Sequence, residues 1–337
     1  MVLVWGISAF TASVLLAGLL RAGAQQIIPL DIPNERSSHS APTPRGGGLS
    51  IVLTFLVGSY CLMVSDLIPS MSFYLLFIPG SLIAFIGFVD DVWAVNPLIR
   101  LFFHFSAAIL FIYYIDGMPV LPWFSERIVV GSWGYLLVAL GLIWCINLNN
   151  FMDGIDGLAS IETICVAGGA AFIIWLTKGE TAFVDLLFLL AAATAGFLIW
   201  NWPPAKIFMG DAGSGFLGFV IGSFALSTSA AGGINLWSWM ILYGVFVVDA
   251  TVTLTRRIVR GEKFYQAHRS HAYQIMARTL KSHKKVTLGI LGINMLWLFP
   301  LSVISSMAPD FSLYCLVIAY LPLLLTVLKV GAGTTNA

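Results

Sequence analysis

Three short segments of the chain combine carboxylates with amides or glycines, the groups that bind a hard cation next to phosphates. They are the pair Asp90-Asp91, residues 147–158 and residues 208–215. Two adjacent carboxylates cannot both stay ionised cheaply without a cation or a proton. Asp90 and Asp91 would therefore face a metal ion or a basic substrate, or one of them would act as a base. The alternative is a solvated pair that marks the edge of a membrane span.

Residues 147–158 carry the densest group of side-chain oxygens, with Asn147, Asn150, Asp153 and Asp156 in a stretch that glycines interrupt. Mg²⁺ is commonly held by one or two carboxylates together with substrate phosphates. Glycine lets the backbone approach a ligand closely. A polar turn with aspartates as helix caps is the structural alternative, but a turn does not need so many side-chain oxygens. We therefore expect a metal and phosphate site here.

Residues 208–215 place Asp211 among three glycines, directly before an apolar stretch. Small residues at the start of a helix expose backbone N–H groups, and the positive end of the helix dipole favours an anion there. Asp211 is then either a helix cap or a metal ligand beside a phosphate.

Residues 31–48 could supply positive charge, because Arg45 in this segment is followed by three glycines, including Gly47. Arginine binds phosphate through paired hydrogen bonds. An ordinary loop is the alternative interpretation.

Residues 256–285 hold nine basic residues against one acid. Attraction to anionic lipid headgroups would explain much of that charge. The run from His268 through Arg269 to His271 is different, because two histidines around an arginine suit a diphosphate, or a phosphate and a metal.

Two further ionisable residues lie inside apolar stretches, where such groups are costly. Asp249 lies about two turns inside a predicted span, and we expect Arg256 or another polar helix to neutralise it. We expect His104 to be a packing residue whose hydrogen bonds are satisfied.

The composition indicates what positions these groups. The chain has 337 residues, 59% hydrophobic and 10% charged, with a mean hydropathy of +0.92. A soluble domain carries about 25% charged residues, far more than this chain. A helix needs roughly 20 apolar residues to cross a bilayer, and inside it the backbone groups must form hydrogen bonds with one another. We therefore predict an all-α polytopic integral membrane protein with ten or eleven transmembrane helices. The predicted spans are residues 2–22, 49–66, 72–89, 98–115, 133–150, 160–177, 182–200, 213–230, 236–255, 286–306 and 311–330.

The order of these spans places the polar segments on one face of the membrane. We expect loops there over residues 23–48, 90–98, 151–159, 201–212 and 256–285, and a small hairpin within 116–132 on the other face. By the same parity, fifteen of the 17 basic residues lie on the face with the polar segments, which the positive-inside rule assigns to the cytoplasm. We therefore expect a periplasmic N-terminus, a cytoplasmic active site and a single transmembrane catalytic domain over residues 1–337.

Acids for a hard cation, basic groups for phosphates and a lipid-accessible face together indicate phosphoryl transfer between a nucleotide-activated group and a membrane lipid. Over nearly its full length the chain resembles the polyprenyl-phosphate N-acetylhexosamine-1-phosphate transferase superfamily, that is, bacterial glycosyltransferase family 4. The resemblance rests on five motifs: Pro44-Arg45-Gly46-Gly47-Gly48, Asp90-Asp91, Asn147-x-x-Asn150-x-x-Asp153-Gly-Ile-Asp156-Gly-Leu, Phe208-Met-Gly-Asp211-x-Gly-Ser and His268-x-x-His271.

Two features resemble the branch that initiates O-antigen lipopolysaccharide: residues 31–48 and the His-Arg-Ser-His-Ala-Tyr run. The peptidoglycan branch has a three-histidine run and a lysine shortly after the paired aspartates. In this chain Arg100 is the only cation near that position.

The resemblance implies transfer of an N-acetylhexosamine phosphate from a UDP-sugar to undecaprenyl phosphate, with release of UMP and with Mg²⁺ or Mn²⁺. The sugar would be N-acetylglucosamine or a 6-deoxy-N-acetylhexosamine such as FucNAc or QuiNAc, and the place would be the bacterial cytoplasmic membrane. The expected partners are these two substrates and the bilayer, with no nucleic acid, and the resemblance also allows a homodimer.

The resemblance also implies a role for each motif residue. Asp211 would be the principal metal ligand with Asn150 beside it, and Asp90, supported by Asp91, would deprotonate or orient the lipid phosphate. Asp156 and Phe208 would bind uridine, Phe208 by stacking, and Asp153 would lie near the sugar phosphates. The expected catalytic residues are Asp90, Asp91, Asp153, Asp156, His268 and His271; the metal ligands are Asp211 and Asn150; the substrate-binding residues are Phe208, Asp156, Arg45, Gly47, Arg269, His268 and Asn147.

Several other interpretations stay open at this point. A peptidoglycan or teichoic-acid type transferase of the same superfamily would use the same motifs, and either direct transfer or a covalent aspartyl intermediate would use the same residues. A transporter or flippase would instead place its charges near the bilayer midplane, often with inverted repeats. A CDP-alcohol phosphotransferase would need an arginine where Ser160 stands.

Overall fold

The computed structural model describes residues 2–27, 30–31, 42–115, 117–118, 121–123, 126–128, 131, 133–179, 181–262 and 268–334. Most of the predicted segment 31–48 before Arg45 lies outside these residues, as do residues 263–267. In chain order the elements are α1 (Val2–Ile27), β1 (Leu30–Asp31), β2 (Thr43–Pro44), α2 (Leu49–Val64), α3 (Ser70–Trp93), α4 (Pro97–Tyr114), β3 (Leu121–Trp123), β4 (Glu126–Ile128), α5 (Trp133–Met152), α6 (Leu158–Lys178), α7 (Ala182–Asn201), α8 (Asp211–Ala230), α9 (Leu236–Leu242), α10 (Gly244–Val259), α11 (Ala272–Leu280), α12 (His283–Ile293), the π-helical turn η1 (Asn294–Leu298), α13 (Phe299–Met307), the 3₁₀ turn η2 (Pro309–Phe311) and α14 (Ser312–Val330).

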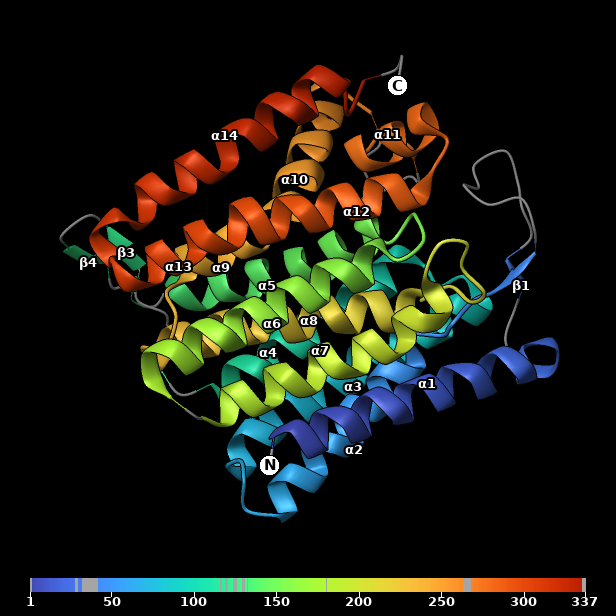
Figure 1. The fold of residues 1–337 in the computed structure, drawn as a ribbon, viewed down its shortest axis with the longest axis horizontal. Coiled ribbons are helices and arrows are strands. Elements are labelled where there is room, and N and C mark those ends of the chain that lie inside the picture. The colour runs from blue at the N-terminus through green and yellow to red at the C-terminus, as the bar shows by residue number, and fades with distance from the viewer. Residues whose placement is uncertain are drawn as a thin grey trace.

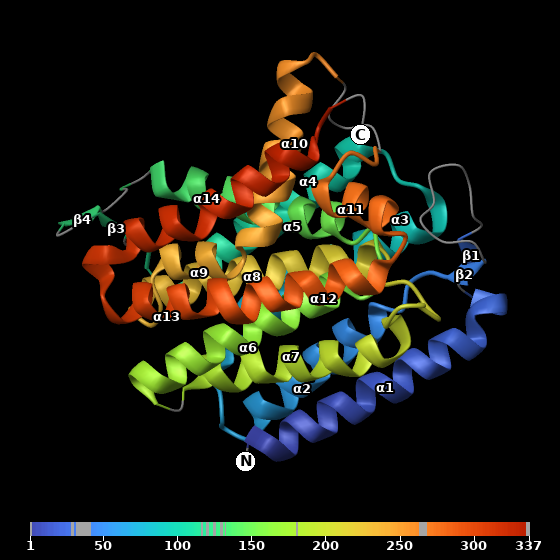
Figure 2. The ribbon, with the colours of Figure 1, turned by 45° about the horizontal axis from the view of Figure 1, so that its top comes forward.

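The long helices lie side by side in one bundle, with α1, α2 and α7 on one side and α12, α13 and α14 on the other (Figure 1). The predicted hairpin is confirmed, because β3 pairs antiparallel with β4. It lies at one end of the bundle, and α11 and β1 lie at the opposite end (Figure 1). Helix α1 begins at the hairpin end and α14 ends at the α11 end (Figures 1 and 2).

The eleven predicted spans all coincide with helices. Within the described residues, nine helices are long and apolar enough to cross a membrane, and the bent pair α9–α10 would make a tenth. The remaining predicted span is the shorter apolar helix α2, with 16 residues. Many large apolar side chains point outward from the bundle; Leu296, for example, is 82% exposed. The chain is therefore an all-α polytopic membrane protein.

Helix α8 forms the centre of the bundle, because almost all of its residues are buried. It packs against α3 and α5 through small residues that bring the backbones together. A Cβ atom on Gly218 would lie 2.3 Å from the carbonyl oxygen of Cys145 in α5, and one on Gly87 in α3 would lie 2.5 Å from the carbonyl oxygen of Asp211. The backbones of α3 and α5 are therefore in van der Waals contact with the backbone of α8.

The ninth predicted span is not one straight helix. It breaks between α9 and α10, whose axes are bent by 81°, and α10 projects away from the bundle (Figure 2). Fully buried Glu162 of α6 lies beside the backbone of Phe246 in the first turn of α10. It accepts a hydrogen bond from the side chain of Asn294, at 2.6 Å, where the π-helical turn begins. Glu162 thus connects α6 to the π-helical turn next to the break.

Residues 256–285 were expected to form a loop, and that prediction is wrong in part. Helix α10 continues to Val259, α11 occupies Ala272–Leu280 and α12 begins at His283. The polar surface of α11 hid its helical period from a search for apolar stretches. Helix α3 likewise continues to Trp93, so that Asp90 and Asp91 lie in its last turn.

The Gly218→Ala substitution should lower the unfolding temperature of the purified protein. The added methyl group would overlap the backbone of α5, and overpacking of this kind costs about 1–3 kcal/mol. Thermal unfolding in detergent measures the change.

The matched control is Gly168→Ala in α6, whose Cβ would meet nothing within 4 Å. It should leave stability unchanged or raise it by about 0.5–1 kcal/mol, because alanine favours helix over glycine. Equal stability of the two variants would show that α5 and α8 are not in backbone contact.

Candidate active site

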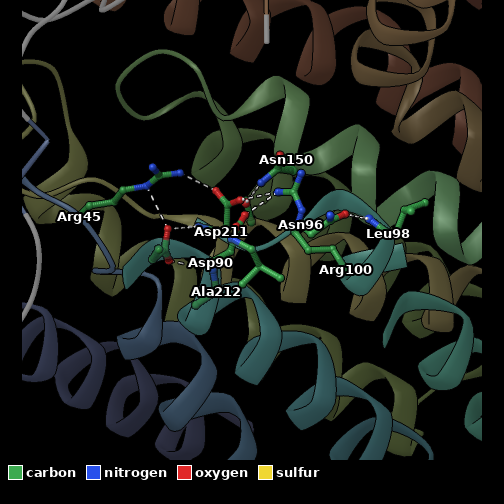
Figure 3. Close-up of polar contacts among 11 residues, drawn as sticks. Arg45, Asp90, Asn96, Leu98, Arg100, Asn150, Asp211 and Ala212 are labelled. Atoms are coloured by element: carbon green, nitrogen blue, oxygen red, sulfur yellow. Dashed lines mark hydrogen bonds and ion pairs between the residues drawn. The ribbon is translucent and has the colours of Figure 1, made fainter. Parts of the chain in front are cut away.

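Asp211, the first residue of α8, lies between two arginines from distant parts of the chain (Figure 3). Arg45 Nη2 is 2.6 Å from Asp211 Oδ1, and Arg100 Nη1 is 3.3 Å from Asp211 Oδ2. Arg100 Nη1 also lies 2.5 Å from Asp90 Oδ2, and the backbone N–H of Val95 donates to Asp90 Oδ1 at 2.6 Å. Both arginines are about one-third exposed, so their outer faces are open to a ligand.

Asp91 performs the capping, which was one of the two roles that the sequence left open for Asp211. Its oxygens accept hydrogen bonds from the backbone N–H groups of Asp211, at 2.8 Å, and Ala212, at 3.1 Å. Arg45 Nε lies 3.0 Å from Asp91 Oδ1, and the Asp91 side chain is only 2% exposed. Gly210 before the helix has φ +79°, and a Cβ there would meet Asp91 Oδ2 at 2.6 Å. The cap therefore frees the side chain of Asp211 to face the two arginines.

The glycines after Arg45 pack the chain against the segment before α8. The N–H groups of Gly47 and Gly48 donate to the carbonyl oxygens of Phe208 and Met209, each at 2.8 Å. A Cβ on Gly48 would lie 2.5 Å from the Cα of Gly213. Gly47, expected to bind substrate, therefore has a backbone partner and holds Arg45 and Phe208 in place.

Three asparagines at the end of α5 have separate partners. Asn150 donates to Ser214 Oγ at 3.1 Å, and its side chain lies beside Asp211 (Figure 3). Buried Asn149 donates to the Ser214 carbonyl oxygen at 2.9 Å and accepts from the Tyr243 hydroxyl at 2.7 Å. Asn147 donates to the carbonyl oxygen of Ile143 in its own helix. Only Asn150 therefore reaches the carboxylate of Asp211.

Asp153 and Asp156 lie in the turn between α5 and α6. Burial raises the pKa of Asp153 well above its usual range, although the nearby guanidinium of Arg45 opposes that shift. Asp156 Oδ2 accepts the backbone N–H of Ala205 at 3.0 Å and lies 3.3 Å from His283 Nδ1. Asp156 therefore connects the turn to the segment before Phe208 and to the start of α12.

The histidine run lies just before α11 and is held by Asp249. Asp249 oxygens accept the backbone N–H groups of Ala272, at 2.9 Å, and Tyr273, at 3.0 Å. His271 Nδ1 lies 3.4 Å from Asp249 Oδ1, and the rings of His268 and His271 stack at 4.9 Å. The partner of Asp249 is therefore the start of α11, which agrees with the expectation that another polar helix would neutralise it.

Arg256, the other expected partner of Asp249, donates instead to the carbonyl oxygen of Ala332. Burial lowers the pKa of His268 to about 4, and the neighbouring His271 and Arg257 add to the effect. His268 is therefore neutral at pH 7, the form in which one ring nitrogen donates and the other accepts a hydrogen bond.

Tyr273 connects the histidine run to the turn after α5. Its hydroxyl donates to the carbonyl oxygen of Phe151 at 2.9 Å, and a Cβ on Gly154 would meet that hydroxyl at 2.1 Å. The ring of Phe151 stacks on His271 at 6.2 Å. The histidines and the Asp153 turn thus meet along this edge.

An apolar cavity of about 750 Å³ opens beside this cluster. Its walls come from α3, α4, α5, α8 and α10. Its apolar lining includes Ile83, Leu101, Leu140, Ile143 and Trp144. Its polar lining consists of Asn96, Arg100, His104, Asn147, Asn150 and Asp211. The cavity therefore has apolar walls and a charged inner end.

Sequence reasoning gave no role in the site to four residues that shape it. Arg100 was noted only as a nearby cation, yet it joins two of the acids. His104 was expected to have its hydrogen bonds satisfied, but its buried Nδ1 has no partner among the described residues. Tyr273 was noted only as the last residue of the His-Arg-Ser-His-Ala-Tyr run, and Asp249 only as an acid inside a predicted span. The four-residue spacing of Arg100 and His104, which places both on one helix face, was the available clue.

The charges of the site show what it could bind. Three carboxylates, those of Asp90, Asp91 and Asp211, are paired with two arginines, which leaves one negative charge in excess when all three are ionised. Among the described residues, no group of three or more His, Cys, Asp or Glu side chains could hold a metal ion. Asp211 with the amide of Asn150 fits a Mg²⁺ ion that takes its other ligands from phosphates and water. The arginines would then bind the phosphates.

The sequence matches a known family model over residues 73–229, and that family is described as glycosyl transferase family 4. The chain is 28% identical over 302 residues to the probable undecaprenyl-phosphate N-acetylglucosaminyl 1-phosphate transferase of Bacillus subtilis, covering 88% of this chain and 82% of the relative.

Two further relatives differ in their named substrates. The decaprenyl-phosphate N-acetylglucosaminephosphotransferase of Mycolicibacterium smegmatis is 30% identical over 323 residues, covering 84% of this chain and 77% of the relative. The phospho-N-acetylmuramoyl-pentapeptide-transferase of Streptococcus pneumoniae is 26% identical over 244 residues, covering 67% and 72%.

The Asp153→Asn variant should unfold at a higher temperature than the wild-type protein at pH 7–8 in metal-free detergent solution. The folded state holds the Asp153 proton more tightly than the unfolded chain, whose pKa is about 3.9. The resulting stability is complete below about pH 4 and is lost as pH rises through the raised pKa. Asparagine cannot ionise, so the variant avoids this loss of stability at higher pH. The difference in unfolding temperature between Asp153→Asn and wild type should therefore shrink towards pH 4 in thermal unfolding scans.

Asp310→Asn serves as the control, because Asp310 is exposed in the turn before α14. It should follow the wild-type pH dependence. An Asp153→Asn protein less stable than wild type at pH 7 would mean that the ionised carboxylate is favourably paired.

Proposed function

The chain belongs to glycosyl transferase family 4, the polyprenyl-phosphate hexosamine-1-phosphate transferases, and is a multi-pass protein of the bacterial inner membrane. From this premise we propose that it transfers an N-acetylhexosamine 1-phosphate from a UDP-sugar to undecaprenyl phosphate and releases UMP. The sugar in this proposal is N-acetylglucosamine or a 6-deoxy-N-acetylhexosamine, and the product starts a lipid-linked surface polysaccharide such as O-antigen. The face that carries the site is then cytoplasmic.

The observation that carries the proposal is the cavity of about 750 Å³ with apolar walls and a charged inner end. Leu98 and Leu140 on its rim are 73% and 48% exposed on the outside of the bundle, so a lipid chain could enter from the bilayer. At the inner end Arg100 connects Asp90 and Asp211. A ligand with a long apolar chain and an anionic head matches this lining, as a polyprenyl phosphate does.

In the proposed reaction an oxygen of the lipid phosphate attacks the β-phosphorus of the UDP-sugar. A phosphorus–oxygen bond forms there, the bond to the α,β-bridging oxygen breaks, and UMP leaves. Phosphoryl transfer depends mostly on positioning and charge neutralisation, which Arg45 and Arg100 can supply. A phosphate monoester has a second pKa of about 6, so a strong base is not required at pH 7.

The two oxygens of Asp90 are held by Arg100 and by the backbone of Val95. That arrangement suits a residue that orients Arg100 and the lipid phosphate, and it favours direct transfer over a covalent aspartyl intermediate. Asp91, which caps α8, would position Asp211 rather than touch substrate.

A divalent cation, Mg²⁺ or Mn²⁺, fits the excess of negative charge in this site. Asp211 and Asn150 would hold it, and it would neutralise the diphosphate of the UDP-sugar. Asp153 would lie close to that diphosphate, and His268, Arg269 and His271 would hold the diphosphate or the sugar.

The uridine would bind at Phe208 and Asp156. Phe208 lies half-buried in the segment that Gly47 and Pro44 hold by backbone hydrogen bonds, and its ring would stack on the uracil. Asp156 fixes the neighbouring Ala205. Uridine would then lie beyond the diphosphate, on the side of the site opposite the lipid.

A peptidoglycan-type transferase remains the second candidate, because the Streptococcus pneumoniae relative is named for that reaction. The two-histidine run of this chain favours the O-antigen branch. A transporter is disfavoured because the charges gather at one end of the bundle rather than at its middle.

The test is a transfer assay on purified protein with undecaprenyl phosphate, Mg²⁺ and a panel of UDP-sugars, scoring UMP and lipid-linked product. Wild-type protein should react with one or two UDP-N-acetylhexosamines. Asp211→Asn should abolish transfer, because it removes the carboxylate that both arginines contact, while Asp310→Asn should be fully active. UMP release without metal, or near-normal turnover by Asp211→Asn, would contradict the metal assignment.

Phe208→Ala should weaken UDP binding more than lipid binding. Stacking of a base on an aromatic ring contributes about 1–3 kcal/mol, so the dissociation constant for UDP should rise about five- to 150-fold in calorimetric titration. The KM for undecaprenyl phosphate should stay within about twofold. An unchanged UDP affinity would remove Phe208 from the nucleotide site.

A further inference from the structure

His104 is a polar residue in the apolar part of the cavity. It lies in the second turn of α4 and lines the cavity together with Arg100 and Asp211. Its Nδ1 is buried and has no hydrogen-bond partner among the described residues. Leaving a buried polar atom unpaired is costly, and such groups in native structures call for an explanation.

His104 shares a helix face with Arg100. The two residues are four positions apart, which places their side chains on the same side of α4. The rise of an α-helix puts His104 about 6 Å further into the membrane. His104 lies within electrostatic range of both Arg100 and Asp211. A phosphate group bound at Arg100 could therefore reach the imidazole with one of its oxygens.

The ring nitrogen of His104 that a ligand in the cavity could reach is Nε2, because Nδ1 is buried. Its surroundings offer few other hydrogen-bonding groups. The walls nearby are apolar, including Leu101, Ile143 and Trp144. Asn147, a polar neighbour in the cavity, already donates to the carbonyl oxygen of Ile143. A trapped water molecule needs two to four polar partners, which this wall does not provide. A ligand that carries its own oxygen atoms fits better.

We propose that Nε2 of His104 hydrogen-bonds the phosphate of the lipid acceptor, one helical turn further into the membrane than Arg100. The inference rests on the proposed function and adds a substrate-binding residue to it. A neutral imidazole presents one N–H donor, and a phosphate oxygen accepts it. Arg100 then binds the outer side of the phosphate and His104 the side towards the chain. The apolar chain would follow the wall of α4 and α5 from there.

Steady-state kinetics of His104→Leu and His104→Gln separate this role from a packing role. Leucine keeps the bulk and removes the donor, so the KM for undecaprenyl phosphate should rise about tenfold or more, as expected for a lost hydrogen bond to a charged group. The KM for the UDP-sugar should stay unchanged. Glutamine carries an N–H donor and should restore the lipid KM to within about threefold of wild type.

Ser106→Ala is the matched control on the same helix. Its hydroxyl donates to the carbonyl oxygen of Phe102, outside the cavity lining, so its kinetic constants should equal those of wild type. An unchanged lipid KM in His104→Leu, or an equal rise in both KM values, would overturn the proposal.

A binding measurement distinguishes failure of this inference from failure of the proposed function. Farnesyl phosphate should raise the unfolding temperature of wild-type protein in detergent more than farnesol does, and His104→Leu should lose most of that difference. Wild-type transfer activity with unaltered farnesyl phosphate binding in His104→Leu would reject only the role of His104. Absence of both transfer and farnesyl phosphate binding in wild-type protein would reject the proposed function itself.

Discussion

Carboxylates at the membrane edge must be neutralised, and the architecture of the site follows from this requirement. Asp91 and Asp211 lie at the start of the central helix α8, where burial makes isolated charges costly. Arg45 contacts both, and Arg100 joins Asp211 to Asp90. The backbone N–H groups of α8 satisfy Asp91. Each acid thus has a partner from a different element, so the cluster holds α2, α3, α4 and α8 in register.

Glycines allow the helices to pack closely enough for these charged residues to meet. Gly48 and Gly213 let the start of α2 touch the start of α8, and Gly87 brings α3 to the same place. Without these close approaches Arg45 could not reach Asp91 and Asp211. The close packing of α8 against α3 and α5 therefore provides a rigid base, which electrostatic preorganisation requires.

The histidine side of the site depends on the broken helix. Glu162 lies beside the start of α10, which carries Asp249 towards the N-terminus of α11. Asp249 holds the turn with His271, and Tyr273 ties it to the turn after α5. Asp249 thus links α10 to the edge of the bundle where a nucleotide-sugar would bind.

The sequence by itself determined the class of the protein, the spans and the side of the bundle on which the polar segments meet, because hydropathy and the parity of crossings are local properties that can be counted. It also predicted that Asp90, Asp91, Asn150 and Asp211 would gather, since each follows or ends a span on the same face. Only the tertiary structure decided which carboxylate caps α8, which arginines neutralise the acids and where α10 bends.

Those decisions depend on contacts between residues far apart in the chain. Arg45 and Asp211 are 166 positions apart, and Glu162 and Asn294 are 132 apart. No local sequence pattern can therefore predict these contacts. His104 shows the same limit, because an imidazole inside an apolar helix looks the same in sequence whether it faces a packed neighbour or a cavity. Packing alone determines which of the two it meets, and with it whether the ring nitrogen has a partner.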